Sequence, residues 1–369
     1  MNIIKKFSAA LISSVMLASA IPFAVSAASG INVQSRTPQQ IAKYIEDNPF
    51  EYEDSGFVTE PDYKNAPYSP GELDSKTLQN ALNTLNTMRF IAGIDEVTLD
   101  SEYNALAQAG TLVNAVLGQL THTPSQPSGM SDELYQKGYK GTSSSNLGMG
   151  YSNLVHSIIY GWMRDSDSSN ISRVGHRRWC LNPSMEKTGF GNTGAYYAMY
   201  TFDNTWGDTD YYGVCWPAQV MPVEYFQDND PWSISMGYTV DASAVEVELV
   251  RKSDGETWSF SQSSADGYFN VENNNYGKKG CIIFRPDDIS YNVGDSFDVS
   301  IIGLDEDVQY TVDFVDIYAQ EKEITAETLS SLADFLVNRM YNEENVSDLD
   351  GDGNINAFDM VYARRNISK

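Results

Sequence analysis

The sequence predicts an α+β fold that continues into an all-β region and ends in a small helical module. Apolar residues recur at helical spacing between residues 74 and 163, which predicts helices. From about residue 245 apolar and polar residues alternate, which predicts strands. Near the end, a short loop with regularly spaced oxygen-bearing side chains precedes an amphipathic stretch. The predicted segments are residues 1–27, 28–73, 74–222, 223–318 and 319–369.

The first segment has the pattern of a secretory signal peptide. Residues 1–27 carry two lysines, an apolar run and the small residues Val25-Ser26-Ala27 at a cleavage position. We therefore expect a secreted, extracellular protein, with residues 28–73 as an extended arm or linker that includes one short helix at residues 37–46. No later stretch has the uninterrupted apolar length of a membrane span, so we expect none.

Composition excludes some partners. Fifty Asp and Glu residues against 24 Lys and Arg give a formal net charge of −26. A surface this acidic repels nucleic acid and anionic lipid. The three cysteines, Cys180, Cys215 and Cys281, are too few for a disulfide scaffold, and both a Cys180–Cys215 pair and buried free thiols remain open.

Three helices and two strands are predicted within residues 74–222. The helices, at residues 74–89, 100–118 and 153–163, each present one apolar face, and Asp100 is a good N-cap. Aromatic-rich runs at residues 195–202 and 211–216 predict strands. Three helices around a short sheet form an α-β-α sandwich.

Residues 223–318 read as strands throughout. Val245, Val247 and Leu249 alternate with glutamates, and Ser253-Asp254-Gly255 then predicts a hairpin turn. Further strands are predicted at residues 281–284, 296–302 and 308–318, and a small immunoglobulin-like sandwich fits this pattern. The aromatic residues Trp232, Trp258, Tyr268 and Phe269 suit either core packing or a sugar-stacking platform.

Residues 348–359 predict an EF-hand-like calcium loop. Oxygen-bearing side chains stand at loop positions 1, 3, 5, 9 and 12, with Gly353 at the position of the sharp turn. Hard cations such as calcium require many oxygen ligands, and this spacing supplies them from one loop. The predicted ligands are Asp348, Asp350, Asp352, Asn354, Asn356 and Asp359.

The same region contains a repeat, because residues 324–329 overlay residues 355–360 at a constant offset. This duplicated loop and helix resembles the dockerin modules of cellulosomes. The first loop lacks alternating carboxylates, so one calcium site is expected. The resemblance implies docking to the cohesin of a scaffold protein in a plant-polysaccharide-degrading complex of an anaerobic bacterium. The residues that would face the cohesin are Ala357, Phe358, Arg364 and Arg365.

An ordered series of motifs lies between about residues 78 and 202: Asn86-Thr87-Met88-Arg89, Thr121-His122-Thr123, Ser145-Asn146-Leu147, Trp162, Gly175-His176-Arg177-Arg178, Leu181-Asn182-Pro183 and Thr188-Gly189-Phe190-Gly191. This series resembles the CAP superfamily of cysteine-rich secretory proteins, antigens and pathogenesis-related proteins. The resemblance implies a cleft in which two histidines and two acidic residues often bind zinc. The matching positions are His122, His176, Asp165 and Ser145, and Ser145 stands where the family usually has Glu.

The role of this cleft remains open at the level of sequence. A serine hydroxyl is a poor zinc ligand, so zinc is possible but the histidines also suit a structural role. A Ser-His-Asp arrangement is conceivable, although no nucleophile-elbow or metalloprotease motif occurs. We expect a binding or interaction module first. The alternative is a metal-dependent or histidine-based hydrolase that acts on glycan, peptide or ester bonds.

Overall fold

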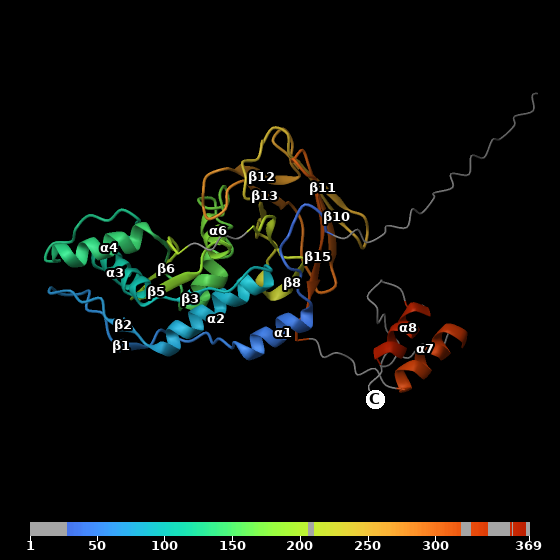
Figure 1. Cartoon of the computed structure of the whole chain (residues 1–369), viewed down its shortest axis with the longest axis horizontal. Helices are drawn as coiled ribbons and strands as arrows, with labels where there is room; N and C mark the ends of the chain where they lie inside the picture. Colours follow the sequence, from blue (N-terminus) through green and yellow to red (C-terminus); the bar gives the residue numbers. More distant parts are fainter. Residues whose placement is uncertain (1–27, 206–209, 319–325, 339–354, 356, 367–369) are drawn as a thin grey trace, which may run out of the picture. The chain divides into compact units, whose positions relative to one another are not determined.

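The computed structural model describes residues 28–205, 210–318, 326–338, 355 and 357–366 (Figure 1). The predicted signal peptide lies outside the described residues. The chain divides into two compact units, of which the first ends at Ile317 and the second begins at Tyr318. Among the residues that the structure describes, no helix combines the length and the apolar character that crossing a bilayer requires.

The first three helices have clear start signals in the sequence. Helix α1 (Pro38–Asp47) follows a capping box in which Thr37 and Gln40 bond each other's backbone N–H groups. Asp74 caps α2 (Ser75–Ile91) and Asp100 caps α3 (Ser101–Leu117), because each carboxylate accepts hydrogen bonds from first-turn N–H groups. The predicted helices at residues 37–46, 74–89 and 100–118 are thus confirmed.

The other helices differ from the prediction. The expected helix at residues 153–163 is a short α5 (Leu154–His156) followed by a π-helix, η1 (Ser157–Trp162). Helices α4 (Asp132–Ser143) and α6 (Gly175–Cys180) were not predicted. Glycine lowers the helix propensity of α4. Helix packing nevertheless requires glycine at position 141, because a Cβ at Gly141 would collide with the carbonyl oxygen of Leu106 in α3.

A four-stranded sheet lies between these helices. Its order is β3 (Thr98–Leu99), β5 (Lys187–Thr193), β6 (Tyr196–Tyr200) and β4 (Ser145–Met149), with the last three antiparallel. Tyr103 of α3 packs with Ala198 and Tyr200 on one face, whereas Phe190 and Met199 join the core on the other face, which includes α2 and η1. The predicted strand at residues 195–202 is confirmed as β6.

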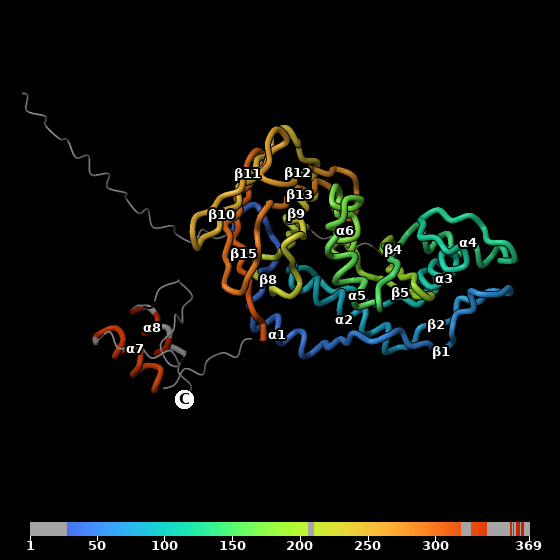
Figure 2. Tube along the Cα trace, turned by 180° about the vertical axis from the view of Figure 1, so that it is seen from behind, coloured from blue at the N-terminus to red at the C-terminus, as the bar shows by residue number. Residues whose placement is uncertain are grey.

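Two further sheets make up the β-rich region. One has the order β11-β10-β14-β15-β8 and the other β12-β13-β9-β7. Their bounds are β7 Val214–Trp216, β8 Val220–Pro222, β9 Trp232–Ser235, β10 Glu246–Arg251, β11 Thr257–Ser261, β12 Gly267–Glu272, β13 Cys281–Pro286, β14 Ser296–Ile302 and β15 Val308–Val315. The ring of Trp232 in β9 contacts Phe297 and Phe314 of the other sheet, so the sheets pack face to face (Figure 2). The immunoglobulin-like type stays a prediction.

Strand β7 corrects one expectation. The sequence predicts that its residues belong to the sheet of residues 74–222, but Cys215 pairs with Ile234 of β9 in the β-rich region. A three-residue apolar strand carries no information about its partner, which tertiary packing decides. The largest cluster of buried apolar residues accordingly extends from Ile41 to Ile317, across both the helical and the β-rich parts.

The predicted arm is folded onto this unit. Ser29 exchanges two backbone hydrogen bonds with Gln309 in β15, and β1 (Phe57–Thr59) pairs with β2 (Glu72–Leu73). Within the described ranges the three cysteines are buried free thiols, so Cys180 and Cys215 are not joined. Burial raises the pKa of the Cys215 thiol to about 12, which makes it unreactive.

The second unit contains two described helices, α7 (Ala326–Asn338) and α8 (Ala357–Asn366). Leu332 of α7 and Ala363 of α8 are buried in one small core, against which Ile355 and Met360 pack. Asp359 is buried, and Ala357 and Arg364 are exposed. The predicted ligands Asp348, Asp350, Asp352, Asn354 and Asn356 lie outside the described residues, so the calcium loop stays a prediction. Phe358 and Arg365 belong to α8.

Candidate functional site

A cleft of about 330 Å³ opens on the first unit beside the four-stranded sheet. Its lining includes His122, Asp165 and His176, so the fold brings together three of the four predicted site residues. Ser145, the fourth, does not line it. The Ser145 side chain is buried at the start of β4, and its hydroxyl has no hydrogen-bond partner among the described residues.

Asp165 and His176 form a tightly held pair. Oδ1 of Asp165 lies 2.7 Å from Nδ1 of His176. Oδ2 accepts hydrogen bonds from the backbone N–H groups of His176, at 2.8 Å, and Arg177, at 3.1 Å. The carboxylate is 2% exposed, and both of its oxygens are occupied. The carboxylate therefore fixes the imidazole through Nδ1 and leaves Nε2 for a ligand.

The electrostatics of this pair favour a protonated imidazole. Burial by itself lowers the pKa of His176, because it disfavours the charged ring. The negative charge of Asp165 and its hydrogen bond to the ring act in the opposite direction and outweigh burial. The net pKa of His176 is raised above its ordinary value of 6.5.

The backbone around the pair is strained. Asp165 has φ 44° and Val174 has φ 40°, both in the left-handed region that favours glycine. For a β-branched residue such as Val174 this conformation is a true outlier, and such residues cost on the order of 1–3 kcal/mol each. Strain of this kind persists where packing enforces it, commonly at functional sites. Here the two strained residues bound the loop that leads from Asp165 to His176.

His122 is held in a similar way from another part of the chain. Its Nδ1 lies 2.8 Å from the carbonyl oxygen of Thr142, and the Thr142 hydroxyl donates back to the His122 carbonyl. A carbonyl can only accept, so Nδ1 carries the proton and Nε2 of the neutral ring has a lone pair. His122 is exposed on the cleft wall. Both cleft histidines are thus oriented through Nδ1.

One comparison with known proteins found a related family. Residues 82–215 match the model of the CAP family, described as the cysteine-rich secretory protein family. These residues form a CAP domain. The comparisons with curated proteins and with solved structures gave no match. The matched stretch contains His122, Asp165 and His176, together with the helices and strands that position them.

The CAP domain's cleft offers few ligands for a metal. A catalytic zinc site requires three protein ligands in addition to water. Both oxygens of Asp165 are already hydrogen-bonded, and Ser145 presents a neutral hydroxyl outside the cleft lining. No group of three or more His, Cys, Asp and Glu within the described ranges is arranged to hold a metal ion. Two imidazoles alone do not fit a catalytic zinc site.

A serine nucleophile is not assembled in the CAP domain either. Acyl transfer by a Ser-His-Asp triad requires the hydroxyl to bond the imidazole. The Ser145 hydroxyl has no such bond to any described residue, whereas the pair of Asp165 and His176 is present.

Tyr151 is a cleft residue that sequence reasoning missed. Its ring lies against the backbone of Gly148 and Gly161, and a Cβ at Gly161 would stand 2.6 Å from its Cζ atom. Burial, together with the charges of Asp165 and Asp167, raises the pKa of Tyr151. Two glycines at spacings unrelated to helix or strand periods were the only sequence signal for this close approach.

The π-helix η1 supplies one wall of the cleft. Met163 N–H bonds the carbonyl of Ile158, five residues back, which inserts one residue into the turn. Trp162 then points inward, and its Nε1 donates to the carbonyl of Leu147 in β4. Such bulges are frequent at functional sites. Here the bulge places Gly161 and Trp162 in the cleft lining.

Hydrogen bonds to the β-rich region hold α6, the helix that carries His176. Arg177 is buried, and its guanidinium donates to the carbonyls of Met163, Arg164 and Pro231. Arg178 donates to the carbonyls of Asn274 and Lys278. Because these arginines follow His176 in α6, the β-rich region fixes the position of the cleft histidine.

Proposed function

We propose that the protein is a secreted component of a polysaccharide-degrading complex, in which the CAP domain binds carbohydrate in its cleft and the C-terminal unit is a dockerin. The observation that carries the binding role is the arrangement of the cleft. Two imidazoles are held through Nδ1, which leaves their Nε2 atoms for a ligand, while both oxygens of the buried Asp165 carboxylate bond His176 and Arg177. A sugar-cleaving site needs two carboxylates free to act as acid and as base or nucleophile.

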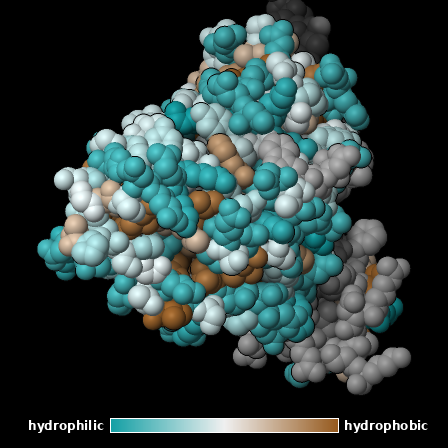
Figure 3. Space-filling model, turned by 60° about the vertical axis from the view of Figure 1, so that its left-hand side comes forward, coloured by the Kyte–Doolittle hydropathy of each residue, from teal (hydrophilic) through white to brown (hydrophobic). Residues whose placement is uncertain are grey.

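The mixed chemistry of the cleft suits a sugar. Leu120 and Met149 are exposed at 39% and 51% and give the lining an apolar part. Tyr151, Arg173 and the histidines supply hydrogen-bonding groups. Carbohydrates present both C–H faces and hydroxyls. Figure 3, which brings forward the side of Figure 1 with α3, α4, β1 and β2, shows hydrophobic patches in hollows of a largely hydrophilic surface.

The dockerin role is supported by sequence spacing and by the helix pair. The calcium loop precedes α8, and Leu332 and Ala363 join α7 and α8 in one core. A unit that begins at Tyr318 can act as a docking module separate from the CAP domain. Its proposed partner is the cohesin of a cellulosome scaffold, and its proposed cofactor is one calcium ion.

Carbohydrate binding is tested by affinity electrophoresis of the full chain through gels that contain soluble plant polysaccharides. We expect retardation of the wild type, and loss of it in His176→Ala and Tyr151→Phe. Tyr139→Phe on α4 is the matched control, since Tyr139 does not line the cleft. Equal retardation of the wild type and both cleft variants would show that the cleft does not bind carbohydrate.

A histidine-based hydrolase is the second candidate, and the raised pKa of His176 favours it. An imidazole that is oriented by a carboxylate and holds its proton more tightly than a free imidazole can act as a general acid. The test is product release from glycan, peptide and ester substrates. Turnover that disappears in His176→Asn would establish hydrolysis, and absence of turnover on all three classes would exclude this candidate.

A further inference from the structure

A row of aromatic side chains leads away from the cleft. We call Phe50, Tyr52, Tyr160, His156 and Tyr151 the aromatic strip. Tyr151 lines the cleft, and its ring centroid lies 6.0 Å from that of His156. The His156 ring lies 4.7 Å from Tyr160, Tyr160 lies 6.3 Å from Tyr52, and Tyr52 lies 6.4 Å from Phe50. The strip therefore connects the cleft, through α5 and η1, to the arm.

The strip lies at the boundary between the hydrophobic core and solvent, because Phe50, Tyr151 and Tyr160 are partly buried and pack against the core. Tyr52 is 50% exposed, and the other four side chains are partly exposed. Nδ1 of His156 is buried and has no hydrogen-bond partner among the described residues. Aromatic side chains gain most from full burial, so a continuous row kept at the surface indicates a binding surface.

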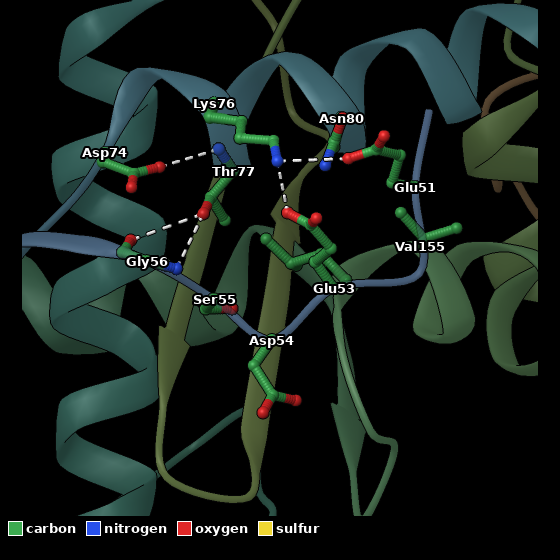
Figure 4. A pocket seen from close by; sticks show the side chains of 11 residues that line it. Glu51, Glu53, Asp54, Ser55, Gly56, Asp74, Lys76, Thr77, Asn80 and Val155 are labelled. Atoms are coloured by element: carbon green, nitrogen blue, oxygen red, sulfur yellow. Dashed lines mark hydrogen bonds and ion pairs between the residues drawn. The ribbon is translucent and has the colours of Figure 1, made fainter. Parts of the chain in front are cut away.

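A small pocket lies beside the arm residues that flank Tyr52, at the end of the strip away from the cleft. It has a volume of about 80 Å³ and lies between the arm and the first turns of α2 (Figure 4). Lys76 bridges Glu51, at 3.1 Å, and Glu53, at 2.5 Å, which are the two neighbours of Tyr52. Val155, the neighbour of His156, lines the same pocket. Carboxylates, an ammonium group and the Asn80 amide thus line a pocket formed in part by the chain neighbours of Tyr52 and His156.

We propose that the aromatic strip is an extended binding surface for a neutral polysaccharide chain, which it guides from the arm into the CAP cleft. This inference rests on the proposed carbohydrate-binding function. Sugar rings stack their C–H faces on aromatic side chains. Successive rings of the strip are inclined to one another by 29° to 67°, so they would contact different units of a chain that turns as it follows the strip. The flanking carboxylates and the amide would bond the sugar hydroxyls.

Charge selects the class of glycan. Glu51, Glu53, Asp54 and Asp74 border the far pocket against the single cation Lys76. In the cleft Asp165 and Asp167 are balanced by Arg173 and His176. The whole chain carries a formal net charge of −26. A uronic acid or sulfated chain would be repelled at the far pocket, where negative charges are in excess. A neutral polysaccharide carries no charge and would not be repelled.

The test compares ligand lengths. The full chain is titrated with a disaccharide, a hexasaccharide and the parent polysaccharide of the neutral glycan that retards it most, and with polygalacturonate as the anionic probe. Tyr52→Leu and Tyr160→Leu keep an apolar side chain and remove the ring. We expect each to weaken binding of the hexasaccharide and the polysaccharide by about five- to tenfold, with disaccharide binding unchanged.

The control and the contrary results separate the two proposals. Tyr139→Leu, on α4 outside the strip, should bind as the wild type does, and circular dichroism checks that every variant is folded. If Tyr52→Leu and Tyr160→Leu bind the hexasaccharide as tightly as the wild type, the proposal that the aromatic strip binds glycan is refuted. The proposal that the cleft binds carbohydrate is then unaffected. If no neutral glycan binds, both proposals fall. Tighter binding of polygalacturonate than of any neutral glycan would overturn the selectivity.

Discussion

The Asp165 carboxylate determines what His176 can do. Sequence and family resemblance place both residues in one cleft, where an acidic side chain is expected to act as a ligand. In the structure the same carboxylate bonds Nδ1 of His176 and two backbone N–H groups of α6. It acts as a support for the imidazole, because both of its oxygens are engaged in hydrogen bonds to His176 and Arg177.

Replacing Asp165 should change the titration of His176. In Asp165→Asn the charge that raises the pKa is absent, and burial, which lowers the pKa, remains. We expect the His176 pKa to fall below that of the wild type. The chain has only three histidines, so NMR titration of their ring protons can resolve each. An unchanged His176 titration would mean that Asp165 does not control it.

The same pair predicts a pH dependence of stability. The pKa of His176 is higher in the folded than in the unfolded chain, so the folded state binds this proton more tightly. Its contribution to the free energy of unfolding is complete below the unfolded value of about 6.5 and is lost as the pH rises through the folded pKa. Urea denaturation of the wild type and of Asp165→Asn between pH 5 and 9 measures this, and their stability difference should shrink as the pH rises.

At the scale of elements, the π-helix η1 and the arginines of α6 shape the site. The bulge in η1 brings Gly161 against the ring of Tyr151, where a side chain larger than glycine would collide with it. Helix α6 has six residues and could not be stable alone. Hydrogen bonds from Arg177 and Arg178 to carbonyls of the β-rich region hold it in place.

Gly161→Ala should affect the cleft more than stability. The added Cβ would stand 2.6 Å from Cζ and 2.7 Å from Oη of Tyr151, at the outer end of a side chain that can turn away. We expect a loss of less than about 1 kcal/mol in the free energy of unfolding, together with weaker glycan binding. Chemical denaturation and affinity electrophoresis measure the two effects. Wild-type glycan binding in this variant would contradict the position assigned to Tyr151.

Arg177→Met should destabilise the first unit strongly. The substitution leaves the carbonyls of Met163, Arg164 and Pro231 without their donor in a buried place. We expect a loss of about 3 kcal/mol or more in the free energy of unfolding. Lys43→Met removes an exposed cation with ion pairs on α1 and should change little. Denaturation curves of the two variants side by side give the comparison, and similar midpoints would refute the supporting role of Arg177.

At the scale of the whole molecule, the CAP domain and the β-rich region share one core, whereas the residues from Tyr318 onward form a second unit. Binding and docking are therefore expected to be separable. Losing calcium should unfold only the second unit, because the predicted ligands all lie within it.

Asp350→Ala combined with Asp352→Ala tests this separation. The double variant should lose calcium and cohesin binding together, since two of the loop's carboxylates are absent. Glycan binding by the CAP domain should remain. Isothermal titration with calcium and pull-down with a cohesin measure the first two properties. Cohesin binding that persists after this change would show that the loop does not carry docking.

The sequence by itself determined the local structure. Caps at Thr37, Asp74 and Asp100 fixed where the first helices begin, because a cap depends on residues only three positions away. Alternation fixed strands β10 and β14 for the same reason. The resemblance to the CAP superfamily predicted that His122, Asp165 and His176 share one cleft. The spacing of these residues along the chain does not by itself predict this.

Only the tertiary structure decided the remaining features. Strand β7 could pair with either sheet, and the fold pairs it with β9. The hydrogen bonds of Asp165 and the contact of Tyr151 with Gly161 join residues 10 to 12 positions apart, and the aromatic strip joins the arm to α5 and η1. Tyr52 and Tyr160 lie more than 100 positions apart, yet their rings stack. Contacts of this kind are set by packing of the whole unit, which no local pattern of residues records.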